Sequence, residues 1–168
     1  MDQLVQTHDQ RSWDVLRDSK YEFFAIQFPD EHAALMVFHV DSKKGRFPVA
    51  TFYNRHSGRA DNGARRPVYS WPIDGIEIRP DRDSKWTSRR SGNSYYLRQR
   101  LRLVSADRSA DLTINMAMKD QEFQEEPGGL WDYEGIGDVR GKLNGRSVNG
   151  QAFLEMVPST VAPPALSR

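Results

Sequence analysis

Residues 95–104 read YYLRQRLRLV, and residues 111–118, one short turn later, read DLTINMAM. In both segments apolar and polar side chains alternate with a period of two, which is typical of a β-strand with one buried face. We therefore expect Arg98, Arg100 and Arg102 to point to solvent. The side chains predicted to point inward are Leu97, Gln99, Leu101, Leu103, Leu112, Ile114, Met116 and Met118.

Short segments rich in aromatic and β-branched residues continue this pattern on both sides of the pair. They cover residues 21–28, 33–40, 47–53, 68–71, 73–78, 131–141 and 148–157. Asn144 and Gly145 separate the last two and form a hairpin-turn dipeptide. About eight or nine strands at this spacing, without helices between them, predict an all-β antiparallel sandwich or barrel.

The ends of the chain differ from this middle part. Trp13 and Leu16 are spaced as on one face of a short helix that Thr7 or Asp9 could cap. Residues 158–168 hold three prolines and small side chains, which favours a mobile tail. The predicted organisation is a helical extension over residues 1–20, a barrel over 21–157 and a tail over 158–168.

Composition excludes several classes of protein. The 168 residues carry a net charge of +1, so no general field attracts nucleic acid. No apolar run is long enough for stable membrane insertion, and the start does not read as a secretory signal. Cysteine is absent, and the four histidines lack metal-ligand spacing, so we expect no metal and no cofactor. These features agree with a cytoplasmic protein.

A few side chains could perform chemistry. Glu134 and Glu155 lie in the last two strands, and a carboxylate facing an apolar cavity would have a raised pKa and exchange protons near neutral pH. The alternative is an exposed acid paired with an arginine. His39 ends an apolar strand and could be a general base or a satisfied residue at the barrel end. The aromatic side chains could line a ligand cavity or simply fill the core.

Several motifs together resemble a known family. Residues 86–95 (WTSRRSGNSY) resemble the W-T-S-P-x-[ST]-G-x-x-Y segment of the lipocalin-like carotenoid hydratases (hydroxyneurosporene synthase) and AttH-type proteins. Residues 97–103 (LRQRLRL) are similar to its V-x-W-x-L-x-[LV] strand, and residues 120–122 (DQE) to its D-Q-E turn. Residues 133–135 (YEG), 139–141 (VRG) and 153–155 (FLE) follow its closing pattern, and residues 21–28 resemble its W-x-W-F-x-x-Q-L strand.

This resemblance implies a lipocalin-like antiparallel barrel that corresponds to the second of the family's two tandem barrels. It also implies chemistry on large apolar substrates, either hydration of an isoprenoid double bond or Diels–Alder-type cyclisation as in fungal Diels–Alderase-like relatives. Three positions depart from the family pattern. Gln99 and Tyr133 replace tryptophans and Arg89 replaces a proline, and the Gln99 amide would face the cavity, where it is unfavourable unless it binds something.

Two hypotheses follow. The chain is either an enzyme of natural-product biosynthesis that folds a polyene, polyketide or terpenoid for cyclisation or hydration, or a carrier that binds an apolar metabolite without chemistry. The candidate catalytic residues are Gln99, Tyr95, Glu155 and Glu134. The candidate ligand-binding residues are Phe23, Gln27, Met36, Phe38, Trp71, Trp131, Tyr133 and Met116. Since one barrel is present, we expect its partner-facing surface to be apolar and a homodimer to cover it.

Overall fold

The computed structural model describes residues 19–42, 45–54, 68–124 and 131–158. In this part of the chain the elements are strands and three short 3-10 turns, η2 (Pro29–Glu31), η3 (Ile73–Gly75) and η4 (Arg82–Ser84). The strands are β1 (Lys20–Phe28), β2 (Ala33–Ser42), β3 (Gly45–Asn54), β4 (Val68–Ser70), β5 (Ile76–Pro80), β6 (Lys85–Thr87), β7 (Ser94–Tyr96), β8 (Arg98–Val104), β9 (Ser109–Met116), β10 (Glu122–Gln124), β11 (Trp131–Leu143) and β12 (Arg146–Val157).

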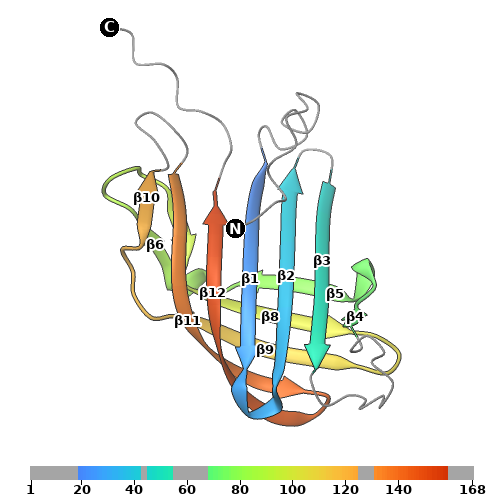
Figure 1. The fold of residues 1–168 in the computed structure, drawn as a ribbon. Helices are drawn as coiled ribbons and strands as arrows, with labels where there is room; N and C mark the ends of the chain where they lie inside the picture. Colours follow the sequence, from blue (N-terminus) through green and yellow to red (C-terminus); the bar gives the residue numbers. More distant parts are fainter. Residues whose placement is uncertain (1–18, 43–44, 55–67, 125–130, 159–168) are drawn as a thin grey trace, which may run out of the picture.

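The strands form one antiparallel sheet folded over on itself as a half-barrel. Its order is β4-β3-β2-β1-β12-β11-β9-β8-β5, with β10 also paired to β11, while β6 and β7 form a separate hairpin. β1, β2 and β3 stand in one layer, and β5, β8 and β9 cross behind them (Figure 1). Within the described ranges no ladder joins β4 to β5, so the sheet has two unpaired edges. The predicted all-β antiparallel barrel class is confirmed.

The strand count exceeds the expected eight or nine because one predicted strand is interrupted and because the short strands β6 and β10 were not predicted. The segment 95–104 breaks at Leu97, whose N–H donates to the Ser84 carbonyl at 3.1 Å and whose carbonyl accepts from the Met116 N–H at 2.8 Å. The chain passes there from the β6–β7 hairpin into the main sheet. The segment 73–78 begins with the η3 turn and becomes strand only at Ile76. The predicted helix near residues 9–18 lies outside the described residues.

Two long strands connect the layers. β11 and β12 pair over their whole length and curve at their turn ends into the back layer (Figure 1). Their turn residues Asn144 and Gly145 have φ of 50° and 79°, as the predicted Asn-Gly hairpin requires. At Gly150 a Cβ atom would lie 2.4 Å from the Gln27 carbonyl oxygen of β1. Glycine therefore allows the close approach of the two backbones.

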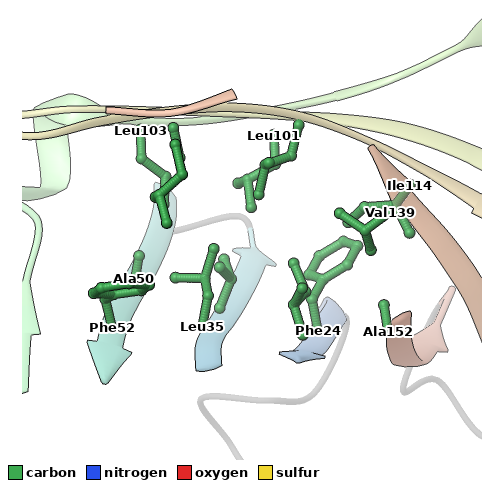
Figure 2. Close-up of a cluster of buried hydrophobic side chains, with 14 of the residues drawn as sticks. Phe24, Leu35, Ala50, Phe52, Leu101, Leu103, Ile114, Val139 and Ala152 are labelled. Atoms are coloured by element: carbon green, nitrogen blue, oxygen red, sulfur yellow. The ribbon is translucent and has the colours of Figure 1, made fainter. Parts of the chain in front are cut away.

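The core lies between the two layers, and Figure 2 shows Phe24, Leu35, Ala50, Phe52 and Ala152 facing Leu101, Leu103, Ile114 and Val139. The inward predictions for Gln99, Leu101, Leu103, Leu112 and Ile114 are confirmed, since each is at most 1 % exposed. Leu97 and Met116 are half-buried. The inward prediction for Met118 is wrong: this side chain is 57 % exposed because β9 ends at Met116, and the alternation ends with it.

The arginines of β8 point outward, as predicted. Arg98, Arg100 and Arg102 are exposed on the convex face of the sheet. Arg98 binds Asp81 at 2.8 Å, and Arg100 binds Asp111 at 2.8 Å across the β8–β9 ladder. Hydrogen bonding to Arg100 holds the pKa of the Asp111 carboxyl below its usual value. Among the described residues there is no helix of the length and apolarity that crossing a membrane requires.

Candidate functional site

Three polar side chains interrupt the apolar interior at the end of the half-barrel where β1 begins and β2 ends. Glu22 shares the inner face of β1 with Phe24, and its register partner on β2 is His39. His39 shares the inner face of β2 with Val37, and Gln99 occupies an inward position of β8. His39 is 7 % exposed and Gln99 1 % exposed. Polar groups at such positions are unfavourable unless they bind one another or a ligand.

The three side chains form one connected group. The Gln99 amide donates from Nε2 to Glu22 Oε1 at 3.4 Å and to the Tyr96 carbonyl at 3.2 Å. His39 Nδ1 lies 3.4 Å from Glu22 Oε2, so both carboxylate oxygens of Glu22 have a partner. Gln99 Oε1 is buried and accepts no hydrogen bond within the described ranges. A buried acceptor of this kind costs free energy unless a ligand or water satisfies it.

A cleft of about 350 Å³ leads from the surface to His39. It lies between β2 and β3 on one side and η3 and β5 on the other, where the two sheet edges do not pair. Pro48, Ile73, Ile76 and Ile78 give it apolar walls, and Arg46, Asp74, Glu77 and Arg79 give it charged ones. A small-molecule site usually has mostly apolar walls with a few convergent polar groups. This cleft adds four charged side chains to such walls.

Tyr95 belongs to a second buried group, centred on the Glu122 carboxylate. Tyr95 donates to Glu122 Oε1 at 2.6 Å, Ser91 donates to the same oxygen at 2.5 Å, and Ser88 donates to Oε2 at 2.5 Å. Burial raises the pKa of the Tyr95 phenol, and the hydrogen bond to Glu122 raises it further. The phenol is therefore a fixed hydrogen-bond donor that joins the β6–β7 hairpin to β10. The two family-like motifs, residues 86–95 and 120–122, are in contact through these hydrogen bonds to Glu122.

The structure does not bring the predicted site residues into one pocket. Of the twelve, four are buried: Gln99, Tyr95, Tyr133 and Trp71, with Met116 half-buried beside them. Trp71 packs edge-on against Phe52 in the core, with ring centroids 6.0 Å apart. Tyr133 contacts Tyr95 at 5.2 Å between centroids and donates to the Met118 carbonyl at 2.7 Å, and burial raises the pKa of its phenol.

The other predicted residues lie elsewhere. Phe23, Gln27, Met36 and Phe38 occupy the outer face of β1 and β2, because Phe24, Ile26, Leu35 and Val37 occupy the inner one. Glu134 and Glu155 are register partners on the outer face of β11 and β12. Trp131 begins β11, where the Arg90 guanidinium lies 5.8 Å from its ring centroid.

One group of acids has the arrangement of possible metal ligands. Carboxylate oxygens of Asp132, Glu134 and Glu155 lie within 4.8 Å of one another, and Tyr21 donates a hydrogen bond to Glu155. Such oxygens suit hard cations such as Ca²⁺ or Mg²⁺. Glu134 is exposed and Glu155 half-buried, so solvent reaches this group from the outer face.

The sequence pattern did not single out Glu22. It offered His39 as a possible general base, but His39 is not among the predicted site residues. The signal for Glu22 is its position: it shares the parity of Phe24, Ile26 and Phe28, which are at most 1 % exposed. A charged residue in phase with a fully buried apolar row is a candidate for function. The segment 21–28 is apolar in both phases, however, so its sequence does not reveal which phase faces inward.

No family model and no curated protein matches the sequence. Among solved structures, the chain resembles kievitone hydratase from Nectria haematococca, with a TM-score of 0.68 and 19 % identity over 85 % of this chain and 40 % of that one. It also resembles CghA, with a TM-score of 0.50 and 16 % identity over 86 % of this chain and 42 % of that one. The chain thus spans about two fifths of each relative. At these identities the likeness shows a shared fold, one that a hydratase also uses.

Proposed function

We propose that the protein is an enzyme that hydrates or cyclises an unsaturated, largely apolar small molecule in natural-product biosynthesis. One observation carries this proposal: His39 and Gln99 are buried and joined through the half-buried Glu22, and His39 lines a cleft with apolar and charged walls. The fold shared with a hydratase supports it. A polyene, polyketide or terpenoid chain suits the isoleucine walls, and the charged residues of the cleft suit a polar end group.

His39 is the proposed acid–base residue, and Glu22 orients it. In a hydration, the protonated imidazole gives a proton to one carbon of the double bond, and the oxygen of a water molecule bonds to the other carbon. The proton that this water then loses returns to the His39–Glu22 pair, so the net change is addition of one water. A positioned imidazole of this kind contributes roughly 10²–10⁴-fold to a rate.

Gln99 is the proposed polar anchor. Its buried Oε1 accepts no hydrogen bond from the part of the chain that the structure describes. Glu22 joins this amide to His39 on the cleft wall, so a substrate hydroxyl or amide group, or the reacting water, that passes His39 would find an acceptor there. In a cyclisation the same contact, together with the isoleucine walls, would hold a flexible chain with its reacting carbons close together. Such preorganisation alone supplies several kcal/mol of barrier reduction. Tyr95, Glu134 and Glu155 have no role in this proposal, because each lies in another group.

The test uses mass spectrometry of small molecules with the full 168-residue chain. An apolar extract of the source cells is incubated in ¹⁸O-labelled water with the wild type, His39→Gln or Glu22→Gln. A product heavier than its precursor by one labelled water identifies a hydratase, and a product of unchanged mass but altered retention identifies a cyclase. Either product should form much more slowly with both variants.

The carrier hypothesis predicts a different result. A compound would then co-purify with the wild type and leave it unchanged in mass and retention, with His39→Gln binding it equally well. That outcome would contradict the proposed enzyme. Arg140→Gln is a suitable control, since Arg140 is exposed on β11 between Thr113 and Asn149, none of which lines the cleft, and its substitution should leave conversion unaltered.

A further inference from the structure

The outer surface of the β3-β2-β1-β12-β11 layer is apolar, although the outer face of an antiparallel sheet is normally polar. Exposed fractions are 51 % for Val49, 42 % for Met36, 37 % for Phe153 and 58 % for Ile136. Phe23 and Phe38 are half-buried on the same face. These six side chains are called the outer apolar face.

The ladder registers make this face continuous. Val49, Phe38 and Phe23 are successive register partners across β3, β2 and β1. Two residues further along each strand, Met36 pairs with Ala25, Ala25 with Phe153, and Phe153 with Ile136. The first row is apolar on β3, β2 and β1 and continues as Glu155 on β12 and Glu134 on β11. The second row is apolar from β2 to β11. Monomeric proteins rarely leave contiguous apolar surface of this extent in water.

The outer apolar face has a groove and, beside the groove, side chains that project from the surface. A groove of about 260 Å³ passes over the small residues Ala25, Ala117 and Gly137, and Phe153 and Ile136 line it too. Met36 and Val49 project from the neighbouring strands β2 and β3. A surface that carries hollows and projections together can be complementary to a copy of itself, as twofold pairing requires.

We propose that a second copy of this chain covers the outer apolar face in a twofold symmetric dimer. With the axis parallel to β1, β3 of one copy lies over β11 of the other. Met36 of each copy then lies over Phe153 at the groove of its partner. The Glu134 and Glu155 pairs of the two copies lie on opposite sides of the axis, each over Val49 and Phe38 of the other copy, so the two acidic pairs do not face each other.

The size of the layer agrees with a stable interface. Five strands about 4.8 Å apart and four rows of outward side chains at about 6.8 Å give a flat area of roughly 650 Å². Standard interfaces bury about 600–1,000 Å² on each partner. The two layers would pack face to face at about 10 Å, as in a β-sandwich. The proposal is independent of the proposed function, because the His39 cleft opens on the inner side of the sheet.

The test is the molar mass in solution by light scattering on a sizing column, followed through the micromolar range. The wild type should have twice the 19.3 kDa mass of one chain and should dissociate on dilution. Met36→Lys and Ile136→Lys should give the single-chain mass at concentrations where the wild type is paired. Val104→Lys is the matched control, because Val104 is also 42 % exposed but lies on β8 in the other layer.

Circular dichroism establishes that each variant is folded. A wild type with the mass of one chain throughout this range overturns the proposal without relying on any variant. A dimer that Val104→Lys disrupts, or that folded Met36→Lys and Ile136→Lys leave intact, also overturns it, because a different surface would then form the contact. None of these measurements depends on substrate conversion at His39. A failure of the dimer proposal can therefore be distinguished from a failure of the proposed function.

Discussion

At the scale of single residues, Gln99 is the clearest departure from a purely structural interior. Its neighbours along the inner face of β8, Leu101 and Leu103, are at most 1 % exposed, and a leucine would fit the same pattern. The amide instead reaches Glu22 and leaves one oxygen unpaired among the described residues. A group that stabilises the fold so poorly is expected to serve binding.

The substitution Gln99→Leu distinguishes a role of Gln99 in stability from a role in binding. The substitution removes the hydrogen bonds to Glu22 and Tyr96, a weaker one to the Met156 sulfur, and one buried unpaired oxygen, and leucine has a similar volume. We therefore expect the free energy of unfolding to change by less than about 1 kcal/mol. Substrate turnover or ligand selectivity should change strongly. Urea unfolding measures the first and conversion assays the second, with Leu101→Ala as a destabilised reference that loses about 2–5 kcal/mol. An unaltered conversion would remove Gln99 from the site.

Tyr95 predicts a loss of stability in alkali. Its folded-state pKa is raised above the ordinary value of 10.0, because burial and Glu122 both disfavour the phenolate. The stabilisation is therefore complete below pH 10 and is lost as the pH rises above it, where the unfolded chain ionises more readily. Between pH 9 and pH 11, thermal unfolding of the wild type should shift down more than that of Tyr95→Phe. Parallel shifts in the two proteins would show that Tyr95 is not protected from ionisation.

The sequence predicted the direction of side chains correctly in strands that have one polar face. The alternation in β8 placed its arginines and leucines correctly, because a slip of one residue would bury three guanidinium groups. The same reasoning could not orient β1 and β2, whose outer faces carry Phe23, Met36 and Phe38. The predicted pocket therefore mixed residues from the two sides of one sheet.

At the scale of elements, the turns and longer strands could be predicted because they depend on local chemistry. The Asn144-Gly145 turn and the hairpin β1–β2 are examples. The three-residue strands β6 and β10 could not be predicted, because segments this short carry no recognisable alternating pattern. The clearest example is Glu122 in β10, whose carboxylate accepts hydrogen bonds from the hydroxyl groups of Ser88, Ser91 and Tyr95.

Gly150 provides a test of how closely β12 approaches β1. Gly150→Ala places a Cβ at 2.4 Å from the Gln27 carbonyl oxygen, so one of the two backbones must shift. We expect a loss of about 2 kcal/mol or more, despite the small gain from a stiffer unfolded chain. The reference is Gly145→Ala, which meets no atom within 4 Å but has a φ of 79° and should lose about 1 kcal/mol. A smaller loss at Gly150 than at Gly145 would contradict the close contact.

At the scale of the whole molecule, the half-barrel has two surfaces of different character. Its open edge exposes a cleft that reaches His39, and its outer layer exposes apolar rows that we propose a second copy covers. The all-β class followed from period-two alternation and strand spacing. The open edge could not be predicted in this way, because pairing between the edge strands β4 and β5 depends on sheet closure, which a strand pattern does not encode.

The proposed acid–base chemistry of His39 can be tested by the turnover number of His39→Gln. Once the labelled-water experiment has identified a converted compound, its dissociation constant and turnover number are measured for the wild type and His39→Gln. Glutamine keeps a polar side chain beside Glu22 but cannot act as an acid–base group at neutral pH. We expect nearly unchanged binding and a turnover number lower by a factor of roughly 10²–10⁴. An equal turnover number in both proteins would contradict the proposed role of His39.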